Sequence, residues 1–434
     1  MSSSSASQAY SLPPCAEGEK TARLESVLDH AAGTVPFYKR LQQEKGSTLT
    51  FYDFPVLSKK RFIDNLDDMM SELYADYEMA HDLRSITTPK TLLYEFTSGS
   101  SGYPLRCYKT IQERTRLALS LHKKRTALYK EFTNDKMFGF IHNLDFESHS
   151  YADSLGNLSE ENIARVLAYL RDVARPRVLH GNTMVFVYYA DYIVRHNFDL
   201  GSWRIEFIES VSESMSREQR DYIEQHFRTT VYNCYGCLEC YNVAYDCTYR
   251  NLHLNENVVL EIVDPETGEE LGESGREGEV LLTSLVNRAQ PFIRYKTGDF
   301  AKLRESDCAC GQSSPIVELS GRRKIDYVKL LYTNDNPDLT ICGYDIFATV
   351  MYRLVSGGHD YVSWYNVIQE ELRLFKVLFI KKQNFSDTFY TLFKQYAEEE
   401  LGMQIDLEFV EKDEAEVLLI NRKNRVFRSL LQND

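Results

Sequence analysis

Residues 160–181 read EENIARVLAYLRDVARPRVLHG, an amphipathic segment followed by a short apolar run. Related segments lie on both sides of this stretch. The apolar run RIEFIES (204–210) is followed by the amphipathic segment SREQRDYIEQHF (216–227), and the apolar run MFGFIHN (137–143) lies upstream. Strands that alternate with helices are typical of a parallel sheet with helices on its faces. The middle of the chain is therefore predicted to be an α/β core.

The sequence changes character after this core. Residues 258–285 contain two apolar runs joined by turn-forming residues such as PETGEE, which predicts a β-rich section with hairpins. Further on, a strand–turn–strand run (364–382) is followed by an amphipathic segment (385–402) and by another strand-like run (405–411), a pattern typical of a small α+β domain. We therefore expect a disordered tail at 1–20, a large α/β N-terminal domain at 21–322 and a small mobile α+β C-terminal domain at 323–434.

The composition narrows the class of protein. Of the 434 residues, 43% are hydrophobic, so a globular core is expected. The chain has 50 Lys and Arg against 64 Asp and Glu, and this acidic excess argues against general nucleic-acid binding. The N-terminus lacks the pattern of a signal peptide, and the most apolar stretch, 184–194, is too short to span a bilayer. Nine cysteines in such a chain favour free thiols, metal ligands or a catalytic role over disulfides. We expect a cytoplasmic protein without a membrane or nucleic-acid partner, and a homodimer stays open.

A Ser/Gly-rich loop follows the apolar run LLYEF (92–96). Small residues allow backbone N–H groups to turn toward a phosphate, and hydroxyl groups add further donors. The spacings of a Walker loop and of a dinucleotide-binding loop are both absent, so an ordinary flexible loop is the alternative. The candidate phosphate ligands are Thr97, Ser98, Gly99, Ser100, Ser101 and Gly102.

Three further short segments carry candidate nucleotide ligands. Tyr235 and Glu239 lie at a predicted strand end, where the ring can face a base and the carboxylate can bind Mg²⁺. Asp299 follows a turn glycine and can accept hydrogen bonds from a ribose diol. Arg322, near the predicted domain boundary, can bind ribose or phosphate. Each segment also has a simpler interpretation as a strand end, a β-turn or a surface ion pair.

The order and spacing of these segments resemble the adenylate-forming superfamily of acyl- and aryl-CoA synthetases. Four segments are similar to its phosphate, adenine and metal, ribose, and hinge motifs, in that order: TSGSSGYP (97–104), YGCLE (235–239), IRYKTGD (293–299) and GRR (321–323). Other stretches resemble its phenylacetate–CoA ligase branch: VPFYKRL (35–41), FPVLSKK (54–60), PFIRYKTGD (291–299) and DCACGQ (307–312).

This resemblance implies an ATP-dependent ligase that converts a small acid, expected to be aromatic, to acyl-AMP and transfers the acyl group to CoA. An amine or a carrier-protein thiol is the alternative acceptor. A catalytically degenerate homologue that binds nucleotide and zinc is the alternative from another class. The implied cofactors are ATP and Mg²⁺, with CoA as the expected acceptor.

The resemblance also assigns roles to individual residues. The loop would hold the phosphates, Tyr235 with Gly236 would pack on adenine, and Glu239 would bind Mg²⁺ and act in catalysis. Asp299 and Arg322 would hold the ribose, and Lys324 would be the hinge. The catalytic cation near the C-terminus is assigned to Lys423, with Arg422 as the alternative because it occupies the strict motif position.

Several positions depart from the family pattern. Tyr103 stands where the phosphate loop usually carries Lys, and Leu238 replaces a residue with a hydroxyl group. Lys324 stands where the hinge residue is usually Asp. The first two changes remove a charge and a donor from the phosphate site, and together with the shifted lysine near the C-terminus they motivate the degenerate alternative.

Two groups of residues, each with three cysteines, are candidate metal ligands. Cys247 and His253 lie in DCTYRNLH, and Cys308 and Cys310 lie in DCACG, as in similar segments of phenylacetate-ligase-like sequences. Together they would form the Cys₃His set of a closed structural zinc site. The alternative is four unrelated side chains, since free Cys is often a small buried apolar residue. The second group, Cys234, Cys237 and Cys240, has iron–sulfur spacing but overlaps YGCLE, which argues against a cluster there.

Overall fold

A computed structural model describes residues 18–81, 83–97, 105–140, 160–211, 215–265, 267–272, 275–320, 327–329, 340–413 and 427–430. The chain forms two compact units. The larger contains most described residues up to Ser320, and the smaller contains those from Tyr327 onward together with the short segment around the Ser/Gly loop. The mixed α/β class predicted from the sequence is confirmed.

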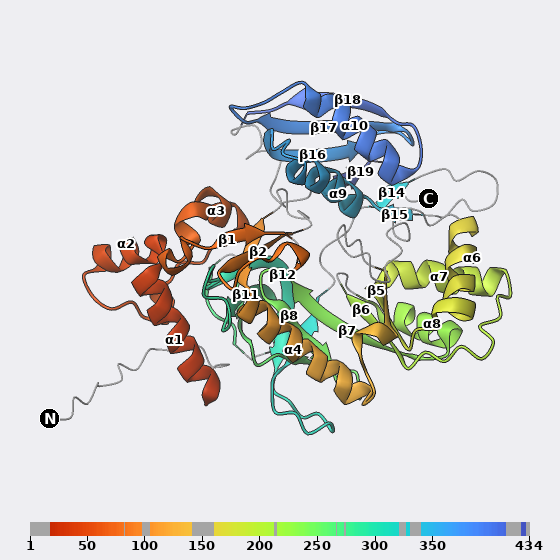
Figure 1. Cartoon of the computed structure of the whole chain (residues 1–434), viewed down its shortest axis with the longest axis horizontal. Coiled ribbons are helices and arrows are strands. Elements are labelled where there is room, and N and C mark those ends of the chain that lie inside the picture. The colour runs from red at the N-terminus through yellow and green to blue at the C-terminus, as the bar shows by residue number, and fades with distance from the viewer. Residues whose placement is uncertain are drawn as a thin grey trace. The chain divides into compact units, whose positions relative to one another are not determined.

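One ten-stranded sheet runs through the larger unit in the order β10-β11-β12-β13-β9-β8-β7-β6-β5-β4 (Figure 1). Its parallel half comprises β4 (Met137–Phe140), β5 (Val178–Asn182), β6 (Phe207–Val211) and β7 (Thr230–Cys237). Its antiparallel half comprises β8 (Tyr241–Asp246), β9 (Leu252–Leu254), β10 (Val258–Val263), β11 (Gly278–Ser284), β12 (Tyr295–Arg304) and β13 (Ile316–Leu319). The predicted parallel core and the predicted β-rich section are therefore two halves of one sheet.

Helices cover both faces of the parallel half. Successive side chains of a strand point to opposite faces, so neighbouring residues of one strand face different helices. Helix α4 (Ile111–Leu128) packs through Leu121 and Leu128 on the face that carries Val211 and Cys234. On the other face, the hydroxyls of Ser210 and Thr183 lie 2.7 Å apart, at the start of α7 (Thr183–Arg195). Helices α6 (Glu160–Tyr169), α7 and α8 (Arg217–Phe227) gather beside β5–β7, and α6 ends in a π-turn, Leu170–Ala174 (Figure 1).

A buried ion pair anchors α4 to the sheet. The Arg125 guanidinium donates to both oxygens of Glu209, at 2.9 and 2.6 Å, and the Tyr245 hydroxyl donates to the same carboxylate at 2.5 Å. Burial by itself would raise the pKa of Glu209, but the neighbouring Arg125 guanidinium lowers it well below its usual range. The carboxylate is therefore charged at neutral pH, and α4 is held in one position on the sheet.

Hydrogen bonds also fix the N-terminus of α4. Thr110 and Glu113 form a capping box, in which each side chain bonds the other residue's backbone N–H, at 3.1 and 2.7 Å. The second carboxylate oxygen of Glu113 accepts from the N–H of Ala289 at 3.0 Å. The strand that enters α4, β3 (Arg106–Thr110), is therefore tied to the segment between β11 and β12.

The N-terminal part of the larger unit is mainly helical. It contains α1 (Glu19–Thr34), α2 (Pro36–Lys45), α3 (Lys59–Asp64) and short 3₁₀ turns. A three-stranded sheet of β1 (Glu78–Ala80), β2 (Thr91–Phe96) and β3 follows. Leu57, between α2 and α3, exchanges backbone hydrogen bonds with Arg294 and Lys296 on either side of Tyr295, at 3.1 and 3.0 Å. FPVLSKK is therefore bound to IRYKTGD.

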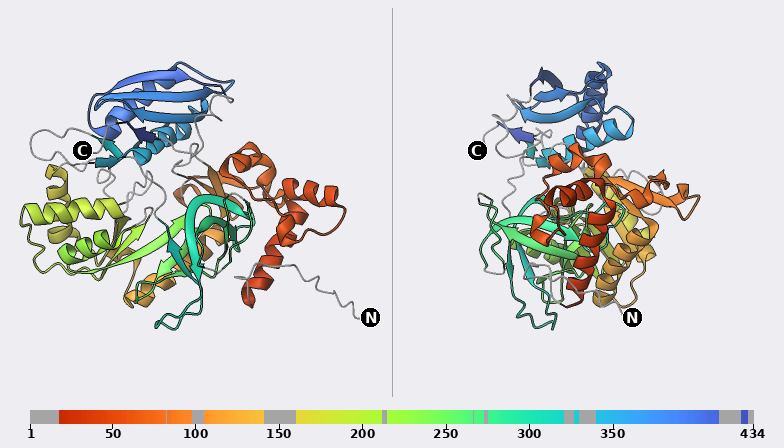
Figure 2. Two further views of the ribbon diagram at one scale, coloured as in Figure 1. Left: turned by 180° about the vertical axis from the view of Figure 1, so that it is seen from behind. Right: turned by 90° about the vertical axis from the view of Figure 1, so that its left-hand side faces the viewer.

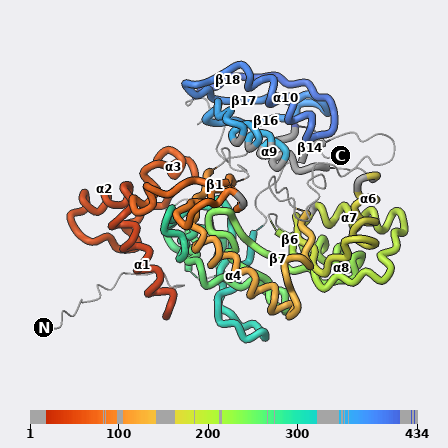
Figure 3. The backbone as a smooth tube through the Cα atoms, in the orientation of Figure 1, coloured from red at the N-terminus to blue at the C-terminus, as the bar shows by residue number. Residues whose placement is uncertain are grey.

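The smaller unit has an α+β structure. Its four-stranded sheet has the order β18-β17-β16-β19, and α9 (Gly343–Ser356) and α10 (Thr388–Leu401) pack on one face of it (Figures 2 and 3). The strands are β16 (Val362–Gln369), β17 (Leu374–Lys381), β18 (Asp406–Glu411) and β19 (Phe427–Ser429), and a separate pair is β14 (Tyr327–Lys329) with β15 (Thr340–Cys342). No helix in the described part of either unit combines the length and apolarity that crossing a bilayer requires.

Candidate functional site

The segment YGCLE lies at the end of β7 and in the tight turn that leads to β8. A bulge interrupts the β7–β8 register between Tyr235 and Gly236. A Cβ atom on Gly236 would lie 2.4 Å from the carbonyl oxygen of Tyr241, so this close approach of two strands requires glycine. The turn therefore places Tyr235 and Glu239 on either side of a position that tolerates no side chain.

Two hydrogen bonds join this turn to strand β12. The Tyr235 hydroxyl donates to Asp299 Oδ2 at 2.9 Å. The Tyr295 hydroxyl donates to Glu239 Oε1 at 2.7 Å. Each segment thus supplies one tyrosine and one carboxylate, and each tyrosine bonds the carboxylate of the other segment. The structure therefore brings together Tyr235, Gly236, Glu239 and Asp299, four of the residues predicted from the sequence.

Both tyrosines are fixed as donors. Burial, followed by the nearby carboxylate, raises the pKa of Tyr235 and of Tyr295 well above its usual value. Glu239 is 6% exposed and uses Oε1 for Tyr295. Among the described residues, none donates a hydrogen bond to its Oε2. This oxygen can therefore serve a hard cation such as Mg²⁺, which prefers carboxylate ligands.

Other residues hold the backbone of the two segments. The Asn287 side-chain amide donates to the Glu239 carbonyl at 2.9 Å, and the Lys109 ammonium donates to the Leu238 carbonyl at 2.8 Å. Gly298 has a φ of 78°, and the Asp299 N–H donates to Thr297 Oγ1 at 3.1 Å. Lys109, Asn287 and Tyr295 were not among the site residues predicted from the sequence.

The Ser/Gly loop is described only at its base. The Leu105 N–H donates to Thr97 Oγ1 at 2.9 Å, and the Thr97 N–H donates to the Leu105 carbonyl at 2.9 Å. Thr97 is 7% exposed, and these two hydrogen bonds close the base of the loop. The other predicted nucleotide, hinge and catalytic residues lie outside the described residues: Ser98, Gly99, Ser100, Ser101, Gly102, Arg322, Lys324, Arg422 and Lys423.

The predicted Cys/His set also converges. Cys247 follows β8, His253 lies in β9, and Cys308 and Cys310 lie in the loop between β12 and β13. The four candidate ligand atoms all lie within 4.8 Å of one another. The Cys247 and Cys308 sulfurs are 3.6 Å apart, and the Cys310 sulfur is 3.3 Å from His253 Nε2. Tetrahedral zinc with Zn–S bonds of about 2.3 Å separates two sulfurs by about 3.8 Å, so these atoms fit such an ion.

Surrounding groups prepare these side chains to bind a metal. His253 Nδ1 lies 3.0 Å from the Ser314 carbonyl, which favours a proton there and leaves the Nε2 lone pair toward the thiols. The Asn251 amide donates to Cys308 at 3.1 Å. A backbone hydrogen bond from Cys310 is the main cause that lowers the pKa of Cys308 to about 6. Burial raises the pKa of Cys247 to about 11. Cys308 is therefore readily deprotonated at neutral pH, whereas Cys247 needs a bound cation to become a thiolate.

The second cysteine group has different surroundings. Cys234 accepts a hydrogen bond from the Asn242 amide at 3.2 Å. The Cys237 and Cys240 thiols are hydrogen-bonded to each other in the turn between β7 and β8. Burial raises the pKa of Cys234. Within the described part of the chain, the only set of three or more metal-type side chains that converge is the Cys/His cluster of Cys247, His253, Cys308 and Cys310.

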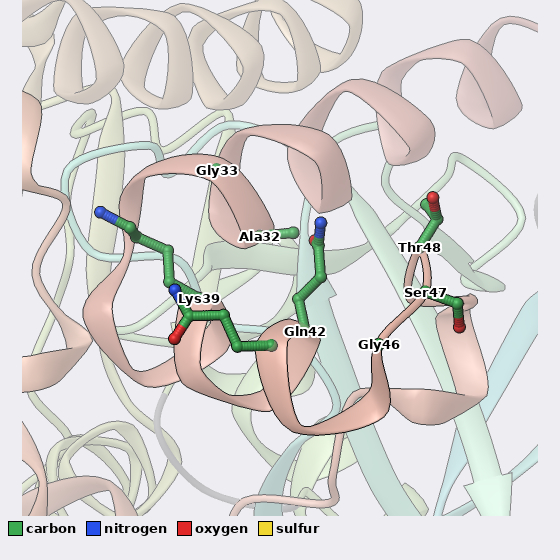
Figure 4. A pocket seen from close by; sticks show the side chains of 8 residues that line it. Ala32, Gly33, Lys39, Gln42, Gly46, Ser47 and Thr48 are labelled. Carbon is green, nitrogen blue, oxygen red and sulfur yellow. The ribbon is translucent and has the colours of Figure 1, made fainter.

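A surface hollow of about 400 Å³ is formed by residues near the N-terminus, at positions 32–48 (Figure 4). Lys39, which lines it, forms an ion pair with Glu72 at 2.6 Å. None of the predicted site residues lines the hollow, which is formed by Ala32, Gly33, Lys39, Gln42, Gln43, Gly46, Ser47 and Thr48. It is therefore not the predicted nucleotide site.

Sequence comparison supports the resemblance seen in the motifs. The chain is 24% identical over 308 residues to the phenylacetate-coenzyme A ligase of Thermus thermophilus, covering 67% of this chain and 66% of that enzyme. It is 25% identical over 297 residues to the Pseudomonas putida enzyme of the same name, covering 65% of each. The chain thus spans just under two thirds of the length of these relatives. No protein-family profile matches the chain.

Structure comparison identifies the fold. A crystal structure of 2-hydroxyisobutyryl-CoA ligase with 2-HIB-AMP and CoA in the thioesterification state has a TM-score of 0.59, covering 94% of this chain and 89% of that one. The same ligase in the postadenylation state with R3-HIB-AMP has a TM-score of 0.55, covering 94% and 88%. Both are 15% identical to this chain, so the likeness concerns the fold, which is that of adenylate-forming CoA ligases.

Proposed function

We propose that the chain is an adenylate-forming ligase that activates a small carboxylic acid with ATP and passes the acyl group to CoA. The observation that carries the proposal is the pair of crossed tyrosine–carboxylate bonds, Tyr235 to Asp299 and Tyr295 to Glu239. These bonds join two segments that are about 60 positions apart and that match the metal and ribose motifs of such ligases. The similarity to phenylacetate-coenzyme A ligases and the ligase fold support the same conclusion.

The reaction solves a chemical problem. A carboxylate is a poor electrophile because resonance and negative charge disfavour attack on its carbon. Attack of the carboxylate oxygen on the α-phosphorus of ATP forms an acyl-AMP anhydride and releases pyrophosphate. The thiol of CoA then attacks the acyl carbon, forms the thioester and releases AMP. The protein contributes position and charge stabilisation at the phosphate, as in other phosphoryl transfers.

Each residue predicted from the sequence has a part in this scheme. Glu239 offers Oε2 to Mg²⁺, which would neutralise charge on the phosphates. Asp299 would accept a hydrogen bond from a ribose hydroxyl, and the Tyr235 ring would pack against adenine. The loop residues 97–102 hold the phosphates, and Arg322 assists at the ribose. Lys423 or Arg422 brings a cation to the reacting carboxylate, and Lys324 is the hinge of the smaller unit.

The acid is proposed to be aromatic, on the similarity to phenylacetate-coenzyme A ligases. The test is to incubate the protein with ATP, Mg²⁺ and CoA over a panel of aromatic, aliphatic and amino acids, and to follow acyl-CoA by mass spectrometry. We expect an acyl-CoA product with at least one aromatic acid. Formation of acyl-AMP without any thioester would instead favour an amine or a carrier-protein thiol as the acceptor.

We also propose that the Cys/His cluster holds one structural Zn²⁺ ion. The donor set of three sulfurs and one imidazole nitrogen is a common one for closed zinc sites. Its residues come from β8, β9 and the β12–β13 loop, so the ion would join two hairpins of the antiparallel half of the sheet. The strand that carries Asp299 also leads into this loop. The zinc would therefore stabilise the part of the sheet on which the ribose ligand lies.

The substitution Asp299→Ala is expected to weaken ATP binding. It removes the ribose acceptor and leaves the buried Tyr235 hydroxyl without its carboxylate partner. Hydrogen bonds to a charged group contribute about 1.5–3 kcal/mol, so the KM for ATP should rise by about 10-fold to 100-fold. The measurement is acid-dependent pyrophosphate release at varied ATP. Asp76→Ala, which removes an exposed carboxylate paired with Lys90, is the control. A KM within twofold of wild type for Asp299→Ala would refute the ribose role.

A further inference from the structure

Lys109 is an unusual residue in strand β3. Its side chain is buried, with 1% exposure, although lysine is almost never fully buried unless it is paired. Its ammonium donates to the Leu238 carbonyl at 2.8 Å and lies 5.0 Å from the centre of the Tyr241 ring. Leu238 lies in the turn between β7 and β8, which carries Glu239, and Tyr241 is the first residue of β8. The charge is therefore placed at the candidate nucleotide site by the strand that follows the Ser/Gly loop.

The ammonium has contacts that only partly compensate for its burial. Among the residues that the structure describes, no carboxylate forms an ion pair with Lys109. A carbonyl oxygen and a ring face offset part of the cost of removing a full charge from water, but an anion offsets far more. An ammonium has three N–H donors, and Leu238 takes one of them. The site thus contains a cation whose natural counterpart is an anion that arrives with a ligand.

Lys109 and Glu239 share one poorly hydrated environment. Burial raises the pKa of the nearby Cys107 thiol well above its usual value, with the Glu239 carboxylate adding to the rise and the Lys109 ammonium opposing it. In such surroundings a charge acts over several ångströms without direct contact. A cation here favours a polyphosphate near the Leu238–Glu239 turn, even though the ammonium itself is covered.

We propose that Lys109 is a positioning residue that supplies a positive charge to the nucleotide polyphosphate, acting through the Leu238–Glu239 turn. The proposal rests on the nucleotide site of the proposed function. It accounts for a functional charge in a chain whose phosphate loop has Tyr103 where a lysine is usual. It also explains why a strand in the interior carries a lysine at all.

The test compares ligands with and without phosphates by isothermal titration calorimetry on the full chain. We expect Lys109→Met to weaken binding of Mg-ATP and of Mg-pyrophosphate by about tenfold or more, and to leave binding of adenosine within twofold of wild type. Lys109→Arg, which keeps the charge, should restore most of the affinity. A purely structural role would change adenosine binding as much as ATP binding.

Two further variants sharpen the comparison. Lys20→Met is the matched control, because the Lys20 ammonium also donates to backbone carbonyls, those of Asn255 and Val258, away from the YGCLE turn. Lys109→Gln keeps a donor for the Leu238 carbonyl but no charge, and it carries the test if Lys109→Met does not fold. Unchanged Mg-ATP affinity in either folded neutral variant, or equal losses for ATP and adenosine, would overturn the proposal.

The result also separates this proposal from the proposed function. A wild-type protein that binds Mg-ATP in a Lys109-dependent way but forms no acyl-AMP would support the role of Lys109 and refute the ligase assignment. A protein that forms acyl-AMP with Lys109→Met at unchanged ATP affinity would do the reverse. A wild-type protein that binds neither Mg-ATP nor Mg-pyrophosphate would contradict both.

Discussion

Glu239→Gln is expected to reduce acid-dependent ATP–pyrophosphate exchange by about 10²-fold to 10³-fold, the loss typical when one electrostatic partner of a transition state is removed. Glutamine has nearly the same shape, and its amide oxygen can still accept from the Tyr295 hydroxyl. The substitution therefore removes the negative charge offered to Mg²⁺ while it preserves the local packing. The measurement is the exchange rate at saturating acid, with thermal unfolding followed in parallel.

The matched control is Glu269→Gln, because Glu269 is an exposed carboxylate in a turn of the same unit. This variant should keep both the exchange rate and the melting temperature of wild type. The exchange rate of Tyr295→Phe should lie between those of Glu239→Gln and Glu269→Gln, since this variant keeps the Glu239 carboxylate but removes the hydrogen bond that fixes its orientation. More than a tenth of wild-type exchange in folded Glu239→Gln would show that this carboxylate is not the metal ligand.

Loss of the proposed zinc site is expected to have the largest effect on stability. Protein purified without chelators should contain about one equivalent of zinc, and the double variant Cys308→Ser, Cys310→Ser should contain almost none. Because zinc binding contributes directly to folding free energy, we expect the melting temperature of the variant to fall by about 5–10 °C. The measurements are metal analysis by mass spectrometry and scanning calorimetry.

Cys237→Ser is the control for this experiment. Cys237 lies in the same unit but outside the Cys/His cluster, so its variant should keep the zinc. Prolonged treatment of wild type with a strong chelator should lower the melting temperature to that of the double variant, and added zinc should restore it. Fewer than about half an equivalent of zinc in wild type, or an unchanged melting temperature in the double variant, would count against the site.

The sequence predicted that these short segments lie together, but not how they contact one another. Tyr235, Glu239 and Asp299 were predicted because their segments resemble known motifs. Their crossed hydrogen bonds were not predictable, because β7 and β12 are separated by three strands in the sheet order. Contact between them depends on the course of the whole sheet, and no local pattern contains that information.

The Cys/His cluster was more accessible to prediction. Its four residues come as two close pairs, and each pair lies in or beside a single hairpin, so that only one long-range contact was needed. That contact is the pairing of β9 with β13, where His253 lies opposite Ile316. Lys109 shows the opposite case. Nothing in the local sequence RCYKT distinguishes an exposed lysine from one that is covered by the turn of another hairpin.

The fold class was predictable for similar reasons. The alternation of strands and helices at 137–227 predicted the parallel half correctly, because each strand–helix–strand unit is local. The junction of this half with the antiparallel strands was not predicted, since the β7–β8 hairpin joins them through a turn that resembles a ligand motif. One five-residue segment thus serves both as a sheet connection and as a candidate metal ligand.

The most direct test of the central claim is the exchange of labelled pyrophosphate into ATP by the purified protein, over a panel of carboxylic acids. This reaction requires reversible formation of acyl-AMP and needs no acceptor, so it isolates the step for which Glu239 and Asp299 are proposed to be arranged. We predict exchange that depends on at least one acid and on Mg²⁺. Binding of Mg-ATP without exchange for any acid in the panel would contradict the assignment.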